Sequence, residues 1–140
     1  MYLANKRWFK SNFLILCSLI VNVLAKLFKM NIGIIGQGFV GNAVFQKFKS
    51  FFDIYTFDLK GSLCNSSLRE ILKKCKVVFV CVPTPMNSDG TCDSRIVEGV
   101  LSSLNQAKEI IAVNKSTVTP GTTKRFNDKF ENLQIVFNPE

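Results

Sequence analysis

The sequence predicts an α/β fold in which a parallel sheet carries helices on both faces. Short apolar segments alternate with segments of helical periodicity from Met30 to the end of the chain, and this alternation is typical of parallel sheets. The first apolar segment enters a glycine-rich turn, and the second ends in a carboxylate, Asp58. A length of 140 residues limits the chain to one domain, which we expect to occupy residues 30–140.

Five strands are expected, each an apolar run of the length that buried strands have. They are Asn31–Ile35, Ile54–Asp58, Val77–Val82, Ile110–Asn114 and Gln134–Phe137. Right-handed crossovers between these strands predict a doubly wound sheet with the strand order 3-2-1-4-5.

Four helices are expected between the strands. They run from about Phe39 to Phe51, Ser67 to Lys74, Arg95 to Gln106 and Thr122 to Phe130. The second begins with Ser67-Leu-Arg-Glu70, which has the spacing of a capping box. Asp93 or Ser94 is expected to cap the third.

The turn after the first strand, Gly36-Gln-Gly38-Phe-Val-Gly41, has the spacing of a dinucleotide-binding site. Gly36 allows a tight turn, Gly38 lets backbone amides approach a pyrophosphate, and Gly41 lets the next helix pack on the sheet. The N-terminus of that helix attracts phosphate. Asp58 is placed to accept hydrogen bonds from the adenosine ribose, which favours NAD over NADP. These features predict a Rossmann-type domain that binds NAD.

Residues 1–29 form a basic, apolar and helical extension that we expect to lie outside the fold. Residues 1–30 hold five basic and no acidic side chains, so only +3 of the net charge of +8 belongs to the rest. A nucleic-acid partner is therefore not indicated. Membrane contact is expected only through the extension, whose apolar run Phe13–Ala25 is shorter than the about 20 residues of a membrane span.

Three readings of the extension stay open: a membrane-touching helix, a signal peptide, and an over-extended gene start with translation from Met30. We favour the last, because an NAD-binding domain needs the cytoplasmic cofactor pool. The five cysteines include no C-x-x-C pair and the chain has no histidine. We therefore expect neither a metal site nor a disulfide framework, and a cytoplasmic location suits such thiols.

Polar loops follow the third, fourth and fifth strands and carry Thr84, Thr117 and Glu140. In a doubly wound sheet, ligands bind beyond the carboxyl ends of the strands. Singly, the two threonines read as turn formers and Glu140 as a frayed terminus. Because all three loops share one edge with the glycine turn, we expect them to contribute to one site.

Five motifs occur in order along the chain: Gly36–Gly41, Val82–Pro85, Asp89–Asp93, Lys115–Thr122 and Phe137–Glu140. Together they resemble the N-terminal NAD-binding domain of the UDP-glucose/GDP-mannose 6-dehydrogenase family. The resemblance implies oxidation of the C6 alcohol of a nucleotide sugar to a carboxylate, in two NAD-dependent hydride transfers through a covalent thiol intermediate. It also implies a nucleotide-sugar substrate and an oligomeric enzyme.

The resemblance implies roles for individual residues. The cofactor would contact Gly36, Gln37, Gly38, Phe39, Val40, Gly41, Asp58, Lys60, Val82, Pro83, Thr84, Pro85, Ser116 and Thr117. Thr117 resembles the hydroxyl that helps to position a catalytic water. Glu140 resembles the first glutamate of the family's N-P-E-F-L motif, in a general-base or water-orienting role.

Two features depart from the family pattern. The segment between Asp58 and Thr84 is short, which leaves Lys60 as a candidate for the basic residue near the ribose. None of the five cysteines matches the family's nucleophile, which lies beyond Glu140 together with the sugar-binding half. We therefore expect a fragment that is inactive alone. The alternative is a free-standing NAD(H)-binding module; a 3-hydroxyacid-type dehydrogenase or a membrane-anchored interaction protein fits these motifs less well.

Overall fold

The computed structural model describes residues 30–139, in which five parallel strands form a single sheet. The strands are β1 (Asn31–Ile35), β2 (Asp53–Phe57), β3 (Val77–Val80), β4 (Ile110–Asn114) and β5 (Leu133–Phe137). The predicted α/β class is confirmed. The predictions made for residues 1–29 and for Glu140 lie outside the described residues.

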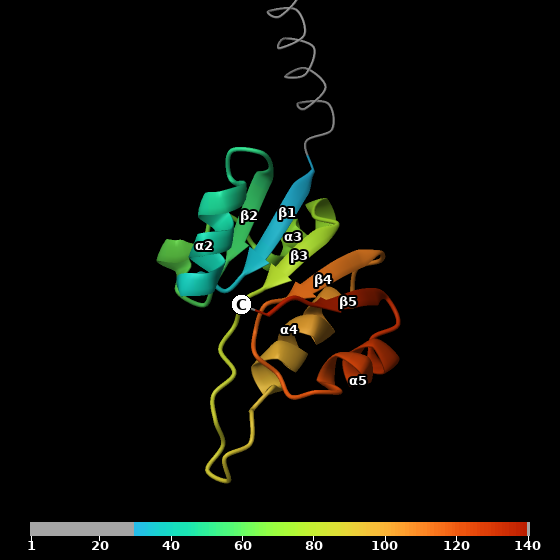
Figure 1. Cartoon of the computed structure of the whole chain (residues 1–140). Coiled ribbons are helices and arrows are strands. Elements are labelled where there is room, and N and C mark those ends of the chain that lie inside the picture. Colours follow the sequence, from blue (N-terminus) through green and yellow to red (C-terminus); the bar gives the residue numbers. More distant parts are fainter. Residues whose placement is uncertain (1–29, 140) are drawn as a thin grey trace, which may run out of the picture.

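The strand order is β2-β1-β3-β4-β5, so the predicted order 3-2-1-4-5 is wrong (Figure 1). The crossover from β2 passes back over β1, and β3 pairs with β1 on one side and with β4 on the other. A wholly apolar strand such as β3 is better placed there than outside β2, where its edge would stay unpaired. The segment between β2 and β3 holds only the turn η1 (Gly61–Leu63) and the helix α3 (Leu68–Lys74).

The helices cover the two faces of the sheet unequally, as Figure 1 shows. They are α2 (Phe39–Phe48), α3, α4 (Arg95–Leu104) and α5 (Thr122–Lys129). On the α2 face, the rings of Phe48 and Phe79 lie 5.7 Å apart. On the opposite face, α3, α4 and α5 bury Ile71, Leu101 and Phe126 in one cluster with Val78 and Val80. From β1 to β2 the sheet grows toward one edge, and after β2 it grows toward the other. Right-handed crossovers therefore place α2 on one face and α3, α4 and α5 on the other.

The local signals for helix ends are partly confirmed. At α3, the Ser67 side chain accepts from the Glu70 N–H, and the Glu70 side chain accepts from the Ser67 N–H, which is the predicted capping box. At α4, the Asp93 carboxylate accepts from the Arg95 N–H, whereas Ser94 makes no side-chain cap bond. Helix α2 ends at Phe48, three residues before the predicted Phe51.

The hydrophobic core lies mainly between the sheet and the three helices α3, α4 and α5. Neighbouring residues of β4 show the asymmetry: Ile110 is 1% exposed and Ile111 is 36% exposed. Val136 of β5, on the same face as Ile111, is 42% exposed. Among the described helices, only α2 packs on that face, so its half over β4 and β5 is left open.

Candidate functional site

The glycine turn between β1 and α2 is held together by backbone contacts that tolerate no side chain at two positions. Gly36 has a φ of +93°, and a Cβ there would lie 2.4 Å from the carbonyl oxygen of Cys81. A Cβ at Gly41 would lie 1.8 Å from the carbonyl oxygen of Gly36. Both glycines are therefore required by the protein's own backbone. The contact with Cys81 also places the turn directly beside the end of β3, at the point where the strand order reverses.

Gly38 differs from the other two glycines of the turn. A Cβ at this position would meet no heavy atom within 4 Å, and the backbone has an ordinary φ of −69°. Gly38 is the N-cap of α2, and no side chain in the described part of the chain caps this helix. The first N–H groups of a helix have no partner within it, and together with the helix dipole they favour an anion such as phosphate.

The carboxylate of Asp58 is tied to the glycine turn. Its Oδ2 accepts from the Gln37 N–H at 2.7 Å, and its Oδ1 accepts from the Lys60 N–H at 2.8 Å. These two bonds, followed by the charge of Lys60, lower the pKa of Asp58 below its ordinary value. The carboxylate is therefore ionised at neutral pH, and each oxygen keeps a lone pair for a ligand hydroxyl.

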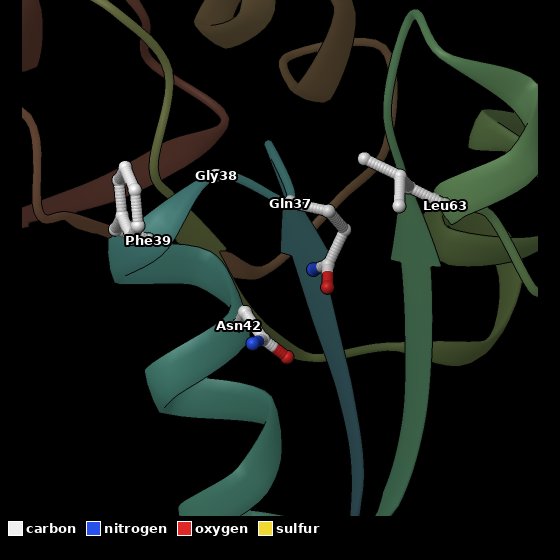
Figure 2. A pocket seen from close by; sticks show the side chains of 5 residues that line it. All are labelled: Gln37, Gly38, Phe39, Asn42 and Leu63. Atoms are coloured by element: carbon white, nitrogen blue, oxygen red, sulfur yellow. The ribbon is translucent and has the colours of Figure 1, made fainter.

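A cavity of about 400 Å³ lies in front of the turn and is lined by Gln37, Gly38, Phe39, Asn42 and Leu63. Figure 2 shows the amide of Gln37 between the first turn of α2 and the end of β2, with Leu63 on the far side. The Nε2 atom of Gln37 is buried and has no hydrogen-bond partner within the described structure. Such a buried donor indicates a ligand or an ordered water in this cavity.

The sequence reasoning did not identify Asn42 and Leu63 as part of this site. Asn42 lies one helical turn after Gly38, so the 3.6-residue period of α2 was a signal for it. Leu63 belongs to η1 and is 45% exposed. Its place beside the cavity depends on how η1 folds back along β2, which has no local sequence signal.

The loop after β3 forms a hairpin that projects from the carboxyl edge of the sheet, drawn in yellow in Figure 1. Met86 and Cys92 form an isolated antiparallel bridge within it, and the Asp93 N–H donates to the carbonyl of Pro85 at 2.8 Å. At its base, Arg95 donates to both oxygens of Asp93, at 2.9 Å from Nε and 2.7 Å from Nη2. Of the residues predicted to line the cofactor here, Val82 and Thr84 are half-buried, and Pro83 and Pro85 are exposed.

The loop after β4 is tied to both of its neighbours. The buried hydroxyl of Ser116 donates to the carbonyl of Val82 at 2.7 Å. The thiol of Cys92 donates to the carbonyl of Thr117 at 3.5 Å, and the Thr117 side chain is exposed. Lys115 donates from Nζ to the Asn138 side chain at 3.1 Å. The structure thus brings the loops after β3, β4 and β5 together at the edge that carries the glycine turn, with Ser116 turned inward.

In residues 30–139, no three Cys, Asp or Glu side chains come together as they do around a metal ion. No disulfide involves the four cysteines of this range. None of its helices has the length and apolar character needed to cross a membrane.

Residues 59–140 match the model of the UDP-glucose/GDP-mannose dehydrogenase family, NAD binding domain. The chain belongs to this family. The match begins directly after Asp58. The assignment of the glycine turn and of Asp58 to the candidate site therefore depends on the geometry described above. The family's NAD-binding domain identifies NAD as the cofactor.

Individual relatives agree with this membership. YtcA from Bacillus subtilis, provisionally named a UDP-glucose 6-dehydrogenase, is 36% identical in an alignment of 87 positions that covers 54% of this chain and 20% of YtcA. A UDP-glucose dehydrogenase from Pyrobaculum islandicum superposes with a TM-score of 0.68 at 20% identity, over 80% of this chain and 36% of its own. A GDP-mannose dehydrogenase from Pseudomonas aeruginosa gives 0.67 at 20% identity, over 79% and 36%. The chain therefore spans about a fifth of YtcA and about a third of the two solved dehydrogenase chains.

The residues present fit a dinucleotide of the kind that this dehydrogenase family binds. Gly38 leaves open space at the uncapped end of α2, where a pyrophosphate needs it. The ionised Asp58 lies beside this end of the helix, and Gln37 offers a buried amide without a partner in the described structure. The cavity between them is bounded by Leu63 on the side of η1.

Proposed function

We propose that this chain is the NAD-holding part of a nucleotide-sugar 6-dehydrogenase, an enzyme that oxidises the C6 alcohol of a UDP-glucose- or GDP-mannose-type sugar to a carboxylate. The observation that carries the proposal is the contrast within the glycine turn. The space that a side chain would need at Gly36 and Gly41 is occupied by the protein's own backbone. At Gly38 this space is open, next to the uncapped N-terminus of α2. That contrast is what a pyrophosphate site at this turn requires.

The cofactor would be held by three groups of residues. Gly36–Gly41 would take the pyrophosphate, and Asp58 the adenosine ribose, with Lys60 beside it. Val82–Pro85 and Ser116–Thr117 would line the nicotinamide side, where Ser116 holds the two loops together and Thr117 offers an exposed hydroxyl. Bound NAD would supply a hydride acceptor for the sugar alcohol. The ionised Asp58 favours a free ribose 2′-hydroxyl, which supports NAD over NADP.

Two residues of the chain would serve the reaction itself. Thr117, exposed at the edge of the sheet, would orient a water molecule, and Glu140, as the family motif implies, would act on that water or on the sugar hydroxyl as a base. We propose that the chain alone binds NAD and does not oxidise the sugar, since its relatives use a much longer protein. The free-standing NAD(H)-binding module stays as the second candidate, in a cytoplasmic setting.

Titration of the full chain with NAD, followed by calorimetry, tests the cofactor part. We expect saturable binding to the wild type and a loss of about tenfold or more in Asp58→Ala, because hydrogen bonds to a charged group are worth about 1.5–3 kcal/mol. Asp128→Ala removes an exposed carboxylate on α5 and should bind NAD like the wild type. Equal affinities of the wild type and Asp58→Ala would contradict the assignment of the ribose site.

Production of NADH from UDP-glucose or GDP-mannose separates the two candidate functions. We expect no NADH from this chain alone. We expect NADH when the assay also contains the protein segment encoded after codon 140. If that sequence holds no Phe-Leu continuation and no later G-x-C motif, the module without catalysis is the better description.

A further inference from the structure

The segment after β2 compensates for the open edge of the sheet. β2 is an edge strand, and residues 63–66 run along its free side. The Asn65 side chain accepts from the Thr56 N–H at 2.7 Å and donates to the carbonyl of Ile54 at 2.9 Å. The Asn65 N–H donates to the Thr56 hydroxyl at 3.0 Å. Side chains of this segment therefore replace part of the ladder that a neighbouring strand would form.

Cys64 performs the same replacement at Asp58, one pleat further along the edge. Its Sγ accepts from the Asp58 N–H and donates to the Asp58 carbonyl, both at 3.0 Å. A third, longer contact of 3.8 Å reaches the carbonyl of Lys60. In extended backbone, the N–H and C=O of one residue point to the same side. A single thiol therefore holds both polar backbone groups of Asp58.

We propose that Cys64 is the positioning residue for the ribose carboxylate of the NAD site, and that its thiol sets the preference for NAD over NADP. Asp58 is then held from two sides: Cys64 holds its backbone, and the N–H groups of Gln37 and Lys60 hold its carboxylate. Without the thiol, the backbone at Asp58 loses its outer partners and the carboxylate can turn away from the ribose. This inference rests on the proposed NAD site.

The chemistry of the side chain decides which replacements keep the function. Alanine and valine neither donate nor accept a hydrogen bond at this position, and valine keeps most of the volume. Serine both donates and accepts, as the thiol does. We therefore expect Cys64→Ser to keep the site and the two apolar variants to lose it.

Binding of NAD and NADP to the full-length variants tests the proposal. In Cys64→Ala we expect NAD affinity to fall about five- to tenfold, as for the loss of about one hydrogen bond, and NADP affinity to change less, so that the NAD-to-NADP ratio falls. Cys64→Ser should stay within about threefold of the wild type. Cys64→Val gives the same expected loss and serves in place of Cys64→Ala if that variant does not fold.

Two further measurements separate positioning from a general structural effect. In an Asp58→Ala background, Cys64→Ala should change NAD affinity by less than about twofold, because its effect passes through Asp58. Without any cofactor, amide exchange at Asp58 should be faster in Cys64→Ala than in the wild type. Cys75→Ala, a change in the buried core, should lower stability and leave the NAD-to-NADP ratio unchanged.

The outcomes distinguish this inference from the proposed function. If the wild type does not bind NAD, the NAD site fails and the role of Cys64 fails with it. If the wild type binds NAD and folded Cys64→Ala or Cys64→Val keeps both its affinity and its ratio, only the role of Cys64 is overturned. An equal loss in the presence and absence of the Asp58 carboxylate overturns it as well.

Discussion

The three glycines of the turn after β1 are present for different physical reasons. Gly36 needs its positive φ and a close approach to Cys81, and Gly41 needs a close approach to Gly36. Gly38 faces open space and has a φ that any residue adopts. The fold therefore depends on Gly36 and Gly41, and the proposed cofactor site depends on Gly38.

Gly38→Ala should leave the fold intact and weaken NAD binding by about tenfold or more, because a methyl group would stand where the pyrophosphate approaches the amides. Thermal unfolding and NAD titration of the same sample measure both properties. A Gly38→Ala variant that binds NAD as tightly as the wild type would contradict a pyrophosphate at the end of α2.

Gly41→Ala should lower the stability of the fold, in contrast to Gly38→Ala. We expect a loss of about 3 kcal/mol or more in the free energy of unfolding, because the added Cβ meets backbone rather than a mobile side chain. Gly99→Ala is the matched control: its Cβ meets nothing within 4 Å in α4, and alanine should stabilise the helix by about 0.5–1 kcal/mol. Urea unfolding curves measure both, and NAD affinity should not change in Gly99→Ala.

The hairpin between β3 and α4 is an element without a core of its own. Its base is closed by the two-pronged bond between Arg95 and Asp93 and by the Asp93 N–H on Pro85. The guanidinium and N–H of Arg95 lower the pKa of Asp93 from 3.8 to about 2. Asp93 is nearly buried although Arg95 is exposed, so the carboxylate depends on this partner.

Asp93→Asn should remove a stabilising contribution that depends on pH. Because the pKa is lower in the folded chain, the ionised Asp93 stabilises the fold above pH 3.8 and loses this effect as the pH falls to about 2. The difference in the free energy of unfolding between the wild type and Asp93→Asn should be largest above pH 3.8 and should shrink as the pH falls toward 2. Urea unfolding at a series of pH values measures it; parallel curves for the two proteins would contradict this origin of the shift.

At the scale of single elements, the sequence was most informative where a local hydrogen bond defines a boundary. The capping box of Ser67 and Glu70 needs no partner from elsewhere in the chain, and it was predicted correctly. The end of α2 has no such local signal. There Phe51 and Phe52 follow Lys49 and Ser50, and Phe52 contacts Phe48 from outside the helix. These apolar residues extend the helical pattern beyond the end of the helix.

The whole molecule has one well-covered and one half-covered sheet face. Three helices pack on the first, and among the described helices only α2 packs on the second. The half of the second face over β4 and β5 exposes Ile111 and Val136. Residues adjacent in one strand therefore contribute very differently to stability.

Ile110 and Ile111 give a matched test of this asymmetry. Ile110→Ala should lower the free energy of unfolding by about 2–5 kcal/mol, because it leaves a cavity in the core. Ile111→Ala should lower it by about 1 kcal/mol or less, because the side chain is already partly in water. Urea unfolding of both variants is the measurement; similar losses would mean that another segment of the chain covers the second face.

The parts of the site that the sequence predicted are those set by neighbours in the chain. The glycine spacing and the distance to Asp58 are local, and the structure joins them through the Gln37 N–H. Asn42, Leu63 and Cys64 were not identified, because their places depend on how α2 and η1 lie against β2. Ser116 stays a predicted cofactor contact, and its bond to the carbonyl of Val82, which ties two loops together, has no local sequence signal.

The sequence by itself determined the α/β class, the five strands and the glycine-rich turn after the first strand, because apolar periodicity and glycine geometry are properties of short segments. Only the tertiary structure decided that β3 lies beside β1. The direction of the crossover after β2 depends on the position at which β3 can pair on both sides, and this position is between β1 and β4. That choice sets the glycine turn against Cys81 at the end of β3. It also leaves β2 at the edge, where the thiol of Cys64 holds Asp58 in place of a strand.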